Sequence, residues 1–263
     1  MAARLKNARG NGASAPNARE LDALRIGKMS VNAALLELLR SDLLSGRVPA
    51  GVKLKIPELC ERYTVSPGSV REALSRLVAE GLVDVADQRG FWSTAVDLQG
   101  LHDITRVRIL IEREALTDAM RHGDLAWEEN VQSSFNDLCS IEQSSIGPHP
   151  EIWRVRHKAF HLCLVSACTS PWLVRMHELL FDQTERYRLI SAASGHITHV
   201  PHRNKEDEHG MLAEAIISRK VGTALFLMEA HLRETAERVE ATIAHSAGAA
   251  AKSRADILSR KDS

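Results

Sequence analysis

One short stretch, residues 65–83, constrains the fold of this chain more than any other. Ser66 is a favoured residue just before a helix, Pro67 suits a first helical turn, and Gly81 is typical of a helix end. Between these signals the apolar residues recur at helical spacing, at Val70, Ala73, Leu74 and Leu77. The stretch is therefore predicted to be a short helix with one apolar side.

A second short helix is predicted just before it, over residues 56–64. Two short helices joined by a tight turn form a helix-turn-helix, which presents its second helix to the major groove of DNA. Ser66, Ser69 and Arg71 fall in the exposed N-terminal half of that second helix. They are therefore candidates to reach base edges and phosphates.

A small β-hairpin is predicted to follow, because apolar residues alternate on both sides of a turn at residues 88–90. A hairpin in this place is the wing of a winged helix-turn-helix, and Arg89 at its tip would meet phosphate or the minor groove. An earlier helix over residues 30–45, apolar on one side, is expected to pack behind the motif.

Residues in and around the motif match the pattern of a known family, at the spacing of that family. They are Leu43-Leu44-Ser45-Gly46, Pro49-Ala50-Gly51-Val52-Lys53-Leu54, Glu58-Leu59, Val65-Ser66, Val70-Arg71-Glu72-Ala73-Leu74, Leu77, Glu80-Gly81-Leu82-Val83 and Arg89-Gly90. Together they resemble the N-terminal domain of the GntR family of bacterial transcription regulators, which implies DNA binding. Pro57 and Pro67 stand where many relatives carry arginines that contact DNA, whereas Arg71 matches the retained arginine. The candidate DNA-binding residues are Arg62, Ser66, Ser69, Arg71, Arg76, Arg89 and Gly90.

Charge leaves an alternative open, because winged helices also serve as protein-interaction modules. The whole chain is formally neutral, and residues 29–98 hold eight Lys and Arg against nine Asp and Glu. A neutral domain binds phosphates strongly only if its positive charges cluster or if it dimerises.

The rest of the chain has a helical pattern almost without interruption, which predicts an all-α bundle. Helices are expected near residues 101–122, 124–143, 151–168, 172–190, 205–219 and 222–245. The predicted fold is therefore mainly α, with an N-terminal winged helix-turn-helix and a C-terminal helical bundle.

Four histidines fall on apolar stripes of three of these helices. His157 and His161 are four residues apart, so their rings share one helix face, as a pair of metal ligands requires. His209 and His231 lie twelve residues before and ten after the turn at Val221, so an antiparallel hairpin places them at nearly the same level. If the helix of His157 packs across that hairpin, four imidazoles converge on one point.

Such a group would suit a divalent transition metal. Neutral imidazoles are good ligands for Zn²⁺, Ni²⁺, Cu²⁺ and Co²⁺, whereas calcium and magnesium prefer oxygen. The alternative is that each histidine is only a hydrogen-bonded core residue, and spacing alone leaves both interpretations open.

A second resemblance bears on this choice, carried by Arg108-Ile109-Leu110-Ile111-Glu112, Phe160-His161, Glu208-His209 and the later His231. These residues resemble the FCD ligand-binding domain of the FadR-like branch of the GntR family. In metal-binding members, three histidines and an acidic residue four positions before the first of them hold a divalent cation. His157 occupies the acidic position here, which is expected to favour Zn²⁺ or Ni²⁺ over Mg²⁺ or Mn²⁺; ligation by oxygen alone would contradict this.

Arg108 is the candidate effector-binding residue. It lies on a largely apolar stripe, and an inward guanidinium needs an anion. That anion is either Glu112, one helical turn on, or the carboxylate of a small effector, as the resemblance implies.

His196, His199 and His202 have no apolar face around them and are interpreted as a polar surface loop rather than a second metal site, with a flap over the pocket as the alternative.

Four segments follow: a mobile basic arm (1–28), a winged helix-turn-helix DNA-binding domain (29–97), a helical effector- and metal-binding domain (98–245) and a flexible tail (246–263). No run of about 18 apolar residues predicts a membrane span, and no signal peptide or disulfide framework is evident. A cytoplasmic location is expected.

The combined interpretation is a homodimeric transcription regulator, acting as a repressor, that binds a palindromic operator and responds to a small organic acid at the metal site. A metal-dependent enzyme that acts on a small carboxylic acid is the first alternative, although no His-Glu-x-x-His motif supplies a general base. A module that binds partners without binding DNA is the second.

Overall fold

The computed structural model describes residues 29–86, 89–142, 150–193 and 203–259, and the boundary between its two compact units falls after Ala95. Each unit is described by itself. The predicted basic arm and the segment with His196, His199 and His202 lie outside the described residues. None of the helices in the described part of the chain combines the length and the hydrophobicity that a membrane span needs.

The N-terminal unit is a winged helix-turn-helix, as predicted. Its elements are α2 (Val31–Leu44), β1 (Lys53–Leu54), α3 (Ile56–Tyr63), α4 (Pro67–Ala79), β2 (Val83–Ala86) and β3 (Gly90–Ser93). Ser66 caps α4, because its side-chain oxygen accepts a hydrogen bond from the Ser69 amide at 3.2 Å. Thr64 closes the turn between α3 and α4 in the left-handed conformation, with φ at 55°.

The wing is a three-stranded antiparallel sheet in the order β1-β3-β2. Val83 pairs with Ser93 across the hairpin, and Lys53 pairs with Trp92 on the other side of β3. Strand β1 was not predicted from the sequence. It has only two residues, too few for an alternating pattern, so its pairing with β3 alone defines it.

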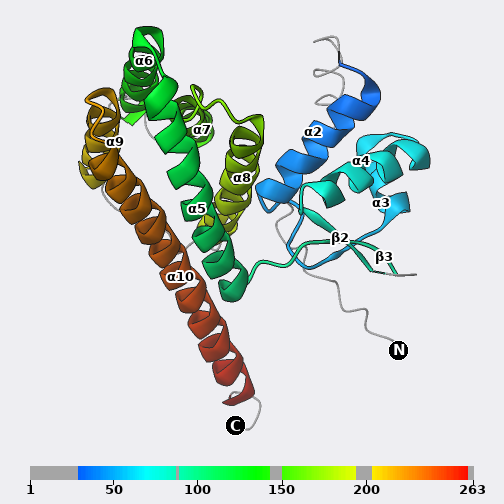
Figure 1. Cartoon of the computed structure of the whole chain (residues 1–263). Coiled ribbons are helices and arrows are strands. Elements are labelled where there is room, and N and C mark those ends of the chain that lie inside the picture. Colours follow the sequence, from blue (N-terminus) through cyan, green and yellow to red (C-terminus); the bar gives the residue numbers. More distant parts are fainter. Residues whose placement is uncertain (1–28, 87–88, 143–149, 194–202, 260–263) are drawn as a thin grey trace, which may run out of the picture. The chain divides into compact units, whose positions relative to one another are not determined.

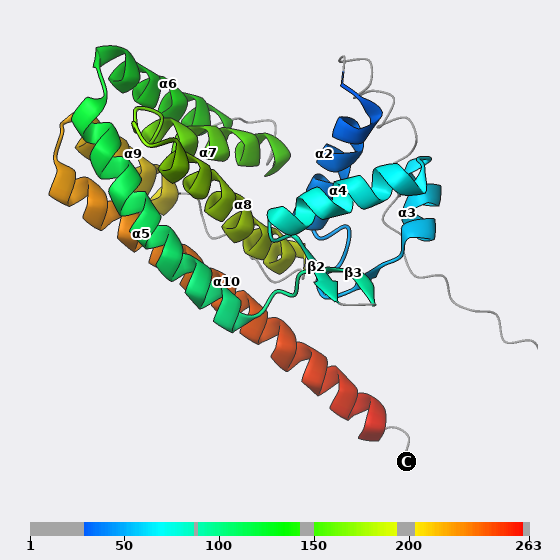
Figure 2. The same cartoon turned by 45° about the vertical axis from the view of Figure 1, so that its right-hand side comes forward.

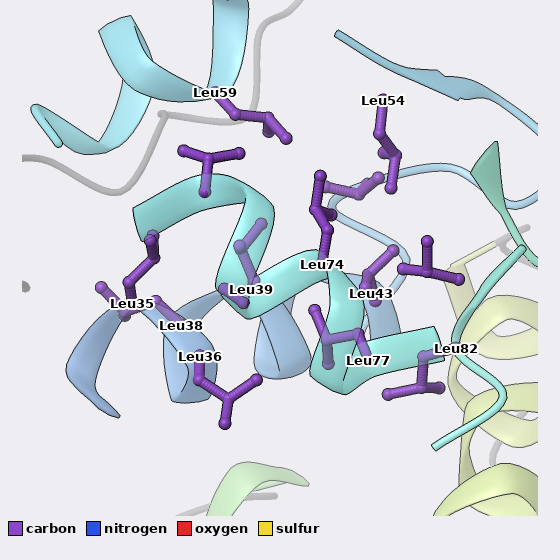
Figure 3. Close-up of a cluster of buried hydrophobic side chains, with 14 of the residues drawn as sticks. Leu35, Leu36, Leu38, Leu39, Leu43, Leu54, Leu59, Leu74, Leu77 and Leu82 are labelled. Carbon is purple, nitrogen blue, oxygen red and sulfur yellow. The ribbon is translucent and has the colours of Figure 1, made fainter. Parts of the chain in front are cut away.

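Leucines from all three helices fill the core of this unit (Figure 3). The apolar side predicted for α4 is buried there, and Val70, Leu74 and Leu77 are fully inaccessible to solvent. Helix α2 lies behind α4, as expected from its apolar stripe. This packing holds the opposite side of α4, with Arg71, at the surface.

The C-terminal unit is the predicted helical bundle (Figure 1). Its helices are α5 (Leu98–His122), α6 (Leu125–Glu142), α7 (Pro150–Leu164), α8 (Pro171–Ala193), α9 (Arg203–Ile217) and α10 (Val221–Ser259). Helices α5 and α10 lie side by side, and α8 packs against both of them. Helix α6 packs between α7 and α9. A large apolar core, including Leu116, Phe160 and Ile216, holds the bundle together.

Two helix ends differ from the expected ones by four residues or more. Helix α7 ends at Leu164 rather than 168, because turn hydrogen bonds replace the helical ladder: the Cys168 amide bonds to the Val165 carbonyl at 2.9 Å. Helix α10 continues to Ser259, although a flexible tail was expected from residue 246, and its end extends past the start of α5 (Figure 2). Alanine has the highest helix propensity, and the alanine-rich composition of this segment favours the helix.

The turn between α9 and α10 is fastened by Arg219. Its Nη2 atom donates to the Gly123 carbonyl at 2.7 Å and to Glu128 at 2.6 Å, and its guanidinium stacks on Trp127 at 5.1 Å. These contacts tie the α9–α10 hairpin to the turn between α5 and α6. The hairpin geometry decides the relative levels of the histidines on its two helices.

Candidate metal centre and nucleic-acid interface

Four histidine side chains from three helices converge inside the C-terminal unit. They are His157 and His161 on α7, His209 on α9 and His231 on α10, and one ring nitrogen of each lies within 4.8 Å of the other three. The Nε2 atoms of His157 and His161 are 3.2 Å apart. Nitrogen ligands at about 2.0–2.1 Å from a tetrahedral zinc are about 3.3 Å apart, so this spacing fits such a site.

The protonation of the cluster also fits a cation. His157, His161 and His209 are 4%, 0% and 2% exposed. Burial, followed by the charges of neighbouring histidines and an arginine, holds the pKa of His157 and His161 well below the usual range. Imidazoles bind metals in their neutral form. A hydrogen bond between the two facing Nε2 atoms would use the lone pair of only one of them, whereas a bound cation would use the lone pairs of both.

Glu208 orients the fourth histidine. Its Oε2 atom lies 3.3 Å from Nδ1 of His231, and its Oε1 atom accepts a hydrogen bond from Arg238 at 3.3 Å. The hydrogen bond from His231 is the main reason why the pKa of Glu208 falls to about 2. A carboxylate at Nδ1 fixes the tautomer in which Nε2 keeps its lone pair, the usual arrangement behind a metal-binding histidine. Sequence analysis assigned no separate role to Glu208.

Arg108 is buried and pairs with Glu112, which is one of the two anions considered for it. The Nε atom of Arg108 donates to Oε1 of Glu112 at 3.1 Å, and Oε2 of Glu112 lies 3.0 Å from Nδ1 of His177. Burial raises the pKa of Glu112, but the charges of His177 and Arg108 outweigh it and lower that pKa below its usual value. The two Nη groups of Arg108 have no hydrogen-bond partner among the described residues.

Residues of α8 that lie near the cluster were missed by sequence reasoning, whereas Trp153, on the face of α7 that carries His157, was expected to point inward. Trp153 stacks on His157 with ring centroids 4.4 Å apart. The guanidinium of Arg188, on α8, lies 5.0 Å from the centre of the Trp153 ring. Phe181 packs 5.5 Å from His161. The only signal was helical spacing along α8, where Phe181 and Arg188 are seven residues apart; it does not say which helix they face.

The lowered pKa values predict a loss of stability in acid when the protein is free of metal. His157 and His161 stay neutral in the folded state, but the unfolded chain binds protons below about pH 6.5, so stability falls with pH. The slope of the unfolding free energy should approach about 1.4 kcal/mol per pH unit for each histidine. Urea unfolding with a chelator between pH 7 and 5 measures it. His161→Asn should reduce the slope; an unchanged slope in this variant contradicts the prediction.

The candidate DNA-binding residues differ in what they contact. Arg71 is exposed and has no ion-pair partner in the described part of the chain, whereas Arg76 pairs with Glu72 at 2.9 Å. Arg62 pairs with the buried Asp42 at 2.8 Å, so contact with DNA would compete with an ion pair inside the unit.

The remaining candidates lie at the start of α4 and at the start of β3. The Ser66 hydroxyl caps α4 and lies 3.1 Å from the Ser69 hydroxyl. Arg89 and Gly90 are exposed at the start of β3, where the φ of 91° at Gly90 suits glycine. Among the candidate arginines, Arg71 and Arg89 are therefore the exposed ones that form no ion pair with a described residue.

Comparisons with known proteins match both units. Residues 32–92 match the family model of bacterial regulatory proteins of the gntR family, and residues 103–234 match the FCD domain. The transcriptional regulator BphR of Paraburkholderia xenovorans is 36% identical over 205 residues, which cover 77% of this chain and 82% of BphR. The transcriptional repressor GlaR of Escherichia coli is 34% identical over 195 residues, or 74% of this chain and 89% of GlaR.

Solved structures share the fold. McbR/YncC of Escherichia coli aligns with a TM-score of 0.67 at 19% identity, over 82% of this chain and 99% of its own. A GntR regulator of Rhodococcus sp. RHA1 aligns with a TM-score of 0.61 at 17% identity, over 81% and 99% of the two chains.

Proposed function

The chain belongs to the GntR family of bacterial transcription regulators, with an FCD domain after its winged helix-turn-helix, and we propose that a small carboxylic acid held at the histidine cluster controls its binding to DNA. It is a DNA-binding regulator and not an enzyme, as its relatives are transcriptional regulators. The acid, the metal and the repressor mode are the proposed parts of this function.

One observation carries the proposal: four metal-type ligands converge in the same buried core as a guanidinium with unpartnered donors. The Arg108 side chain is only 6% exposed, and a carboxylate can accept hydrogen bonds from both of its Nη groups as a bidentate pair. Glu112 and Phe181, which lies 4.9 Å from the Arg108 guanidinium, hold that side chain in place.

The proposed metal ligands are His157, His161, His209 and His231, and zinc or nickel suits four imidazoles best. A cation with a coordination position beyond the four imidazoles would supply positive charge for a carboxylate oxygen. The protein residues do the rest: Glu208 fixes the His231 tautomer, and burial keeps the cluster neutral before metal binds.

The proposed response is an equilibrium between two arrangements of the DNA-binding units in a homodimer. An acid changes DNA affinity only if it binds one arrangement more tightly than the other. Two-fold symmetry of the dimer would match a palindromic operator.

Fluorescence anisotropy with DNA from upstream of the protein's own gene tests whether an acid changes the affinity for DNA. It compares zinc-loaded and chelator-treated protein, each with a panel of small carboxylic acids. Acid-dependent release that requires zinc is expected; DNA affinity that no acid changes contradicts the proposal.

Arg71→Ala is expected to weaken DNA binding by about 10- to 100-fold, because one exposed contact to base or phosphate costs about 1–3 kcal/mol. Loss of one phosphate contact also lowers the slope of log K against log salt by about one. Anisotropy titrations at several salt concentrations measure both quantities. Arg106→Ala is the matched control: it removes the same charge from α5, where Arg106 is 74% exposed and pairs with Asp103. Equal affinities for the two variants would exclude Arg71 from the interface.

A further inference from the structure

The start of the C-terminal unit is held by one tyrosine of another helix. The boundary between the two units falls after Ala95, and α5 begins at Leu98. Asp97 caps this helix, because its side chain accepts a hydrogen bond from the Gly100 amide at 2.7 Å. Tyr187 of α8 is 7% exposed, and Leu98 packs against the small apolar cluster to which this tyrosine belongs. The first turn of α5 is therefore fastened to α8.

The Tyr187 hydroxyl lies directly against the backbone of that first turn. A Cβ atom placed on Gly100 would be 2.5 Å from the hydroxyl oxygen, so one of the two groups would have to move. Glycine has no Cβ and leaves room for this close approach. Burial raises the pKa of Tyr187, and a hydrogen bond with the Asp97 backbone acts against that rise. The contact has no slack, so a small displacement of α8 relative to α5 breaks it.

Another part of α8 contacts the histidine cluster. The Phe181 ring packs 5.5 Å from that of His161, and the Arg108 guanidinium lies 4.9 Å from the same phenyl ring. One helical turn earlier, Nδ1 of His177 lies 3.0 Å from the carboxylate that pairs with Arg108. Phe181 and Tyr187 are six residues apart, which is about 9 Å along a helix. A short helical segment therefore joins the cluster to the start of α5.

We propose that Tyr187 couples the histidine cluster to the start of α5, where the chain leaves the winged helix-turn-helix. This inference rests on the proposed function, because it names the residue through which the acid acts on DNA binding. A carboxylate on the Nη groups of Arg108 changes the charge beside Phe181 and so displaces α8 relative to α5. Packed helices slide by about 1–2 Å in such transitions, which is enough to break the hydroxyl contact. If Tyr187 only fills the apolar cluster, its hydroxyl has no influence on the response.

Tyr187→Phe tests the coupling, because it removes the hydroxyl and keeps the ring. Fluorescence anisotropy of the zinc-loaded, full-length protein measures the DNA affinity with and without acetate, lactate, succinate or benzoate. The factor by which an acid changes the DNA affinity is expected to fall about fivefold in the variant, the effect of one lost hydrogen bond. Isothermal titration should find the affinity for the acid unchanged. A merely structural role would not separate these two quantities.

Gly100→Ala tests the same contact from its other side. Its Cβ displaces the hydroxyl, so the response to the acid should fall as it does in Tyr187→Phe. Without the hydroxyl, the same Cβ meets only the Asp97 carboxylate at 3.3 Å and the aromatic ring at 3.7 Å. The double variant should therefore respond as strongly as Tyr187→Phe alone, so the two effects are not additive.

Thr105→Val is the matched control. It removes a buried hydroxyl from α5 whose partner, the Leu101 carbonyl, belongs to the same helix, so the response to the acid should be unchanged. Thermal unfolding shows whether each variant is folded, and Gly100→Ala supplies the answer if Tyr187→Phe is not.

The failures are distinguishable. If an acid changes the DNA affinity equally in the wild type, Tyr187→Phe and Gly100→Ala, the coupling inference is wrong and an acid-responsive regulator remains. A response that falls as much in Thr105→Val as in Tyr187→Phe also overturns the inference. If no acid changes the DNA affinity of the zinc-loaded wild type, the proposed function and this inference fail together.

Discussion

His209→Ala is expected to remove about one equivalent of zinc or nickel from the protein and to lower its thermal unfolding temperature sharply. A ligand that binds only the folded state stabilises it by RT ln(1 + [L]/Kd), or about 4 kcal/mol when the metal is a thousandfold above its Kd. Elemental analysis of protein purified without an affinity tag or chelator, together with thermal unfolding before and after zinc is added, measures both effects.

His102→Ala is the matched control for this experiment. His102 is 58% exposed on α5 and pairs with Glu240, away from the cluster, so its loss should leave the metal content unchanged. His231→Ala should behave like His209→Ala, because both histidines belong to the cluster. Wild-type protein that binds no metal even after zinc is added would make the four histidines structural.

Asp42→Ala is expected to destabilise the N-terminal unit by about 3 kcal/mol. The carboxylate is fully buried between Arg47, Arg62 and the Tyr63 hydroxyl, which donates a hydrogen bond to it. Removal of one member of a buried charged network leaves the others unpaired. The cost is moderated because both arginines are partly exposed and can turn to solvent.

Hydrogen exchange of the α2 and α4 amides in the full-length protein measures this loss separately from the stability of the helical unit. Glu61→Ala supplies the control: it removes an exposed acid from α3, and its effect should stay within about 0.5 kcal/mol. If exchange in α2 and α4 is the same for both variants, the Asp42 network does not hold the motif together.

Local signals determined most of the N-terminal unit. The limits of α4 were predictable to within a few residues, because Ser66, the proline after it and the glycine at 81 act on the backbone within one helical turn. The apolar periodicity that predicted a helix also predicted its buried side, since one helix face must pack. The same reasoning predicted the bundle and the inward faces of His157 and His161.

Tertiary structure alone decided the partners of these residues. Spacing placed Arg108 on an inward face but left Glu112 and an effector as equal alternatives, and it gave no role to His177, which lies 65 residues further on and completes that pair. Arg188 reaches the Trp153 ring only because α8 packs against α7. Helical periodicity specifies which side of a helix is buried, because that depends on neighbours within a few turns. It does not specify which helix lies opposite, because that depends on how the whole core packs.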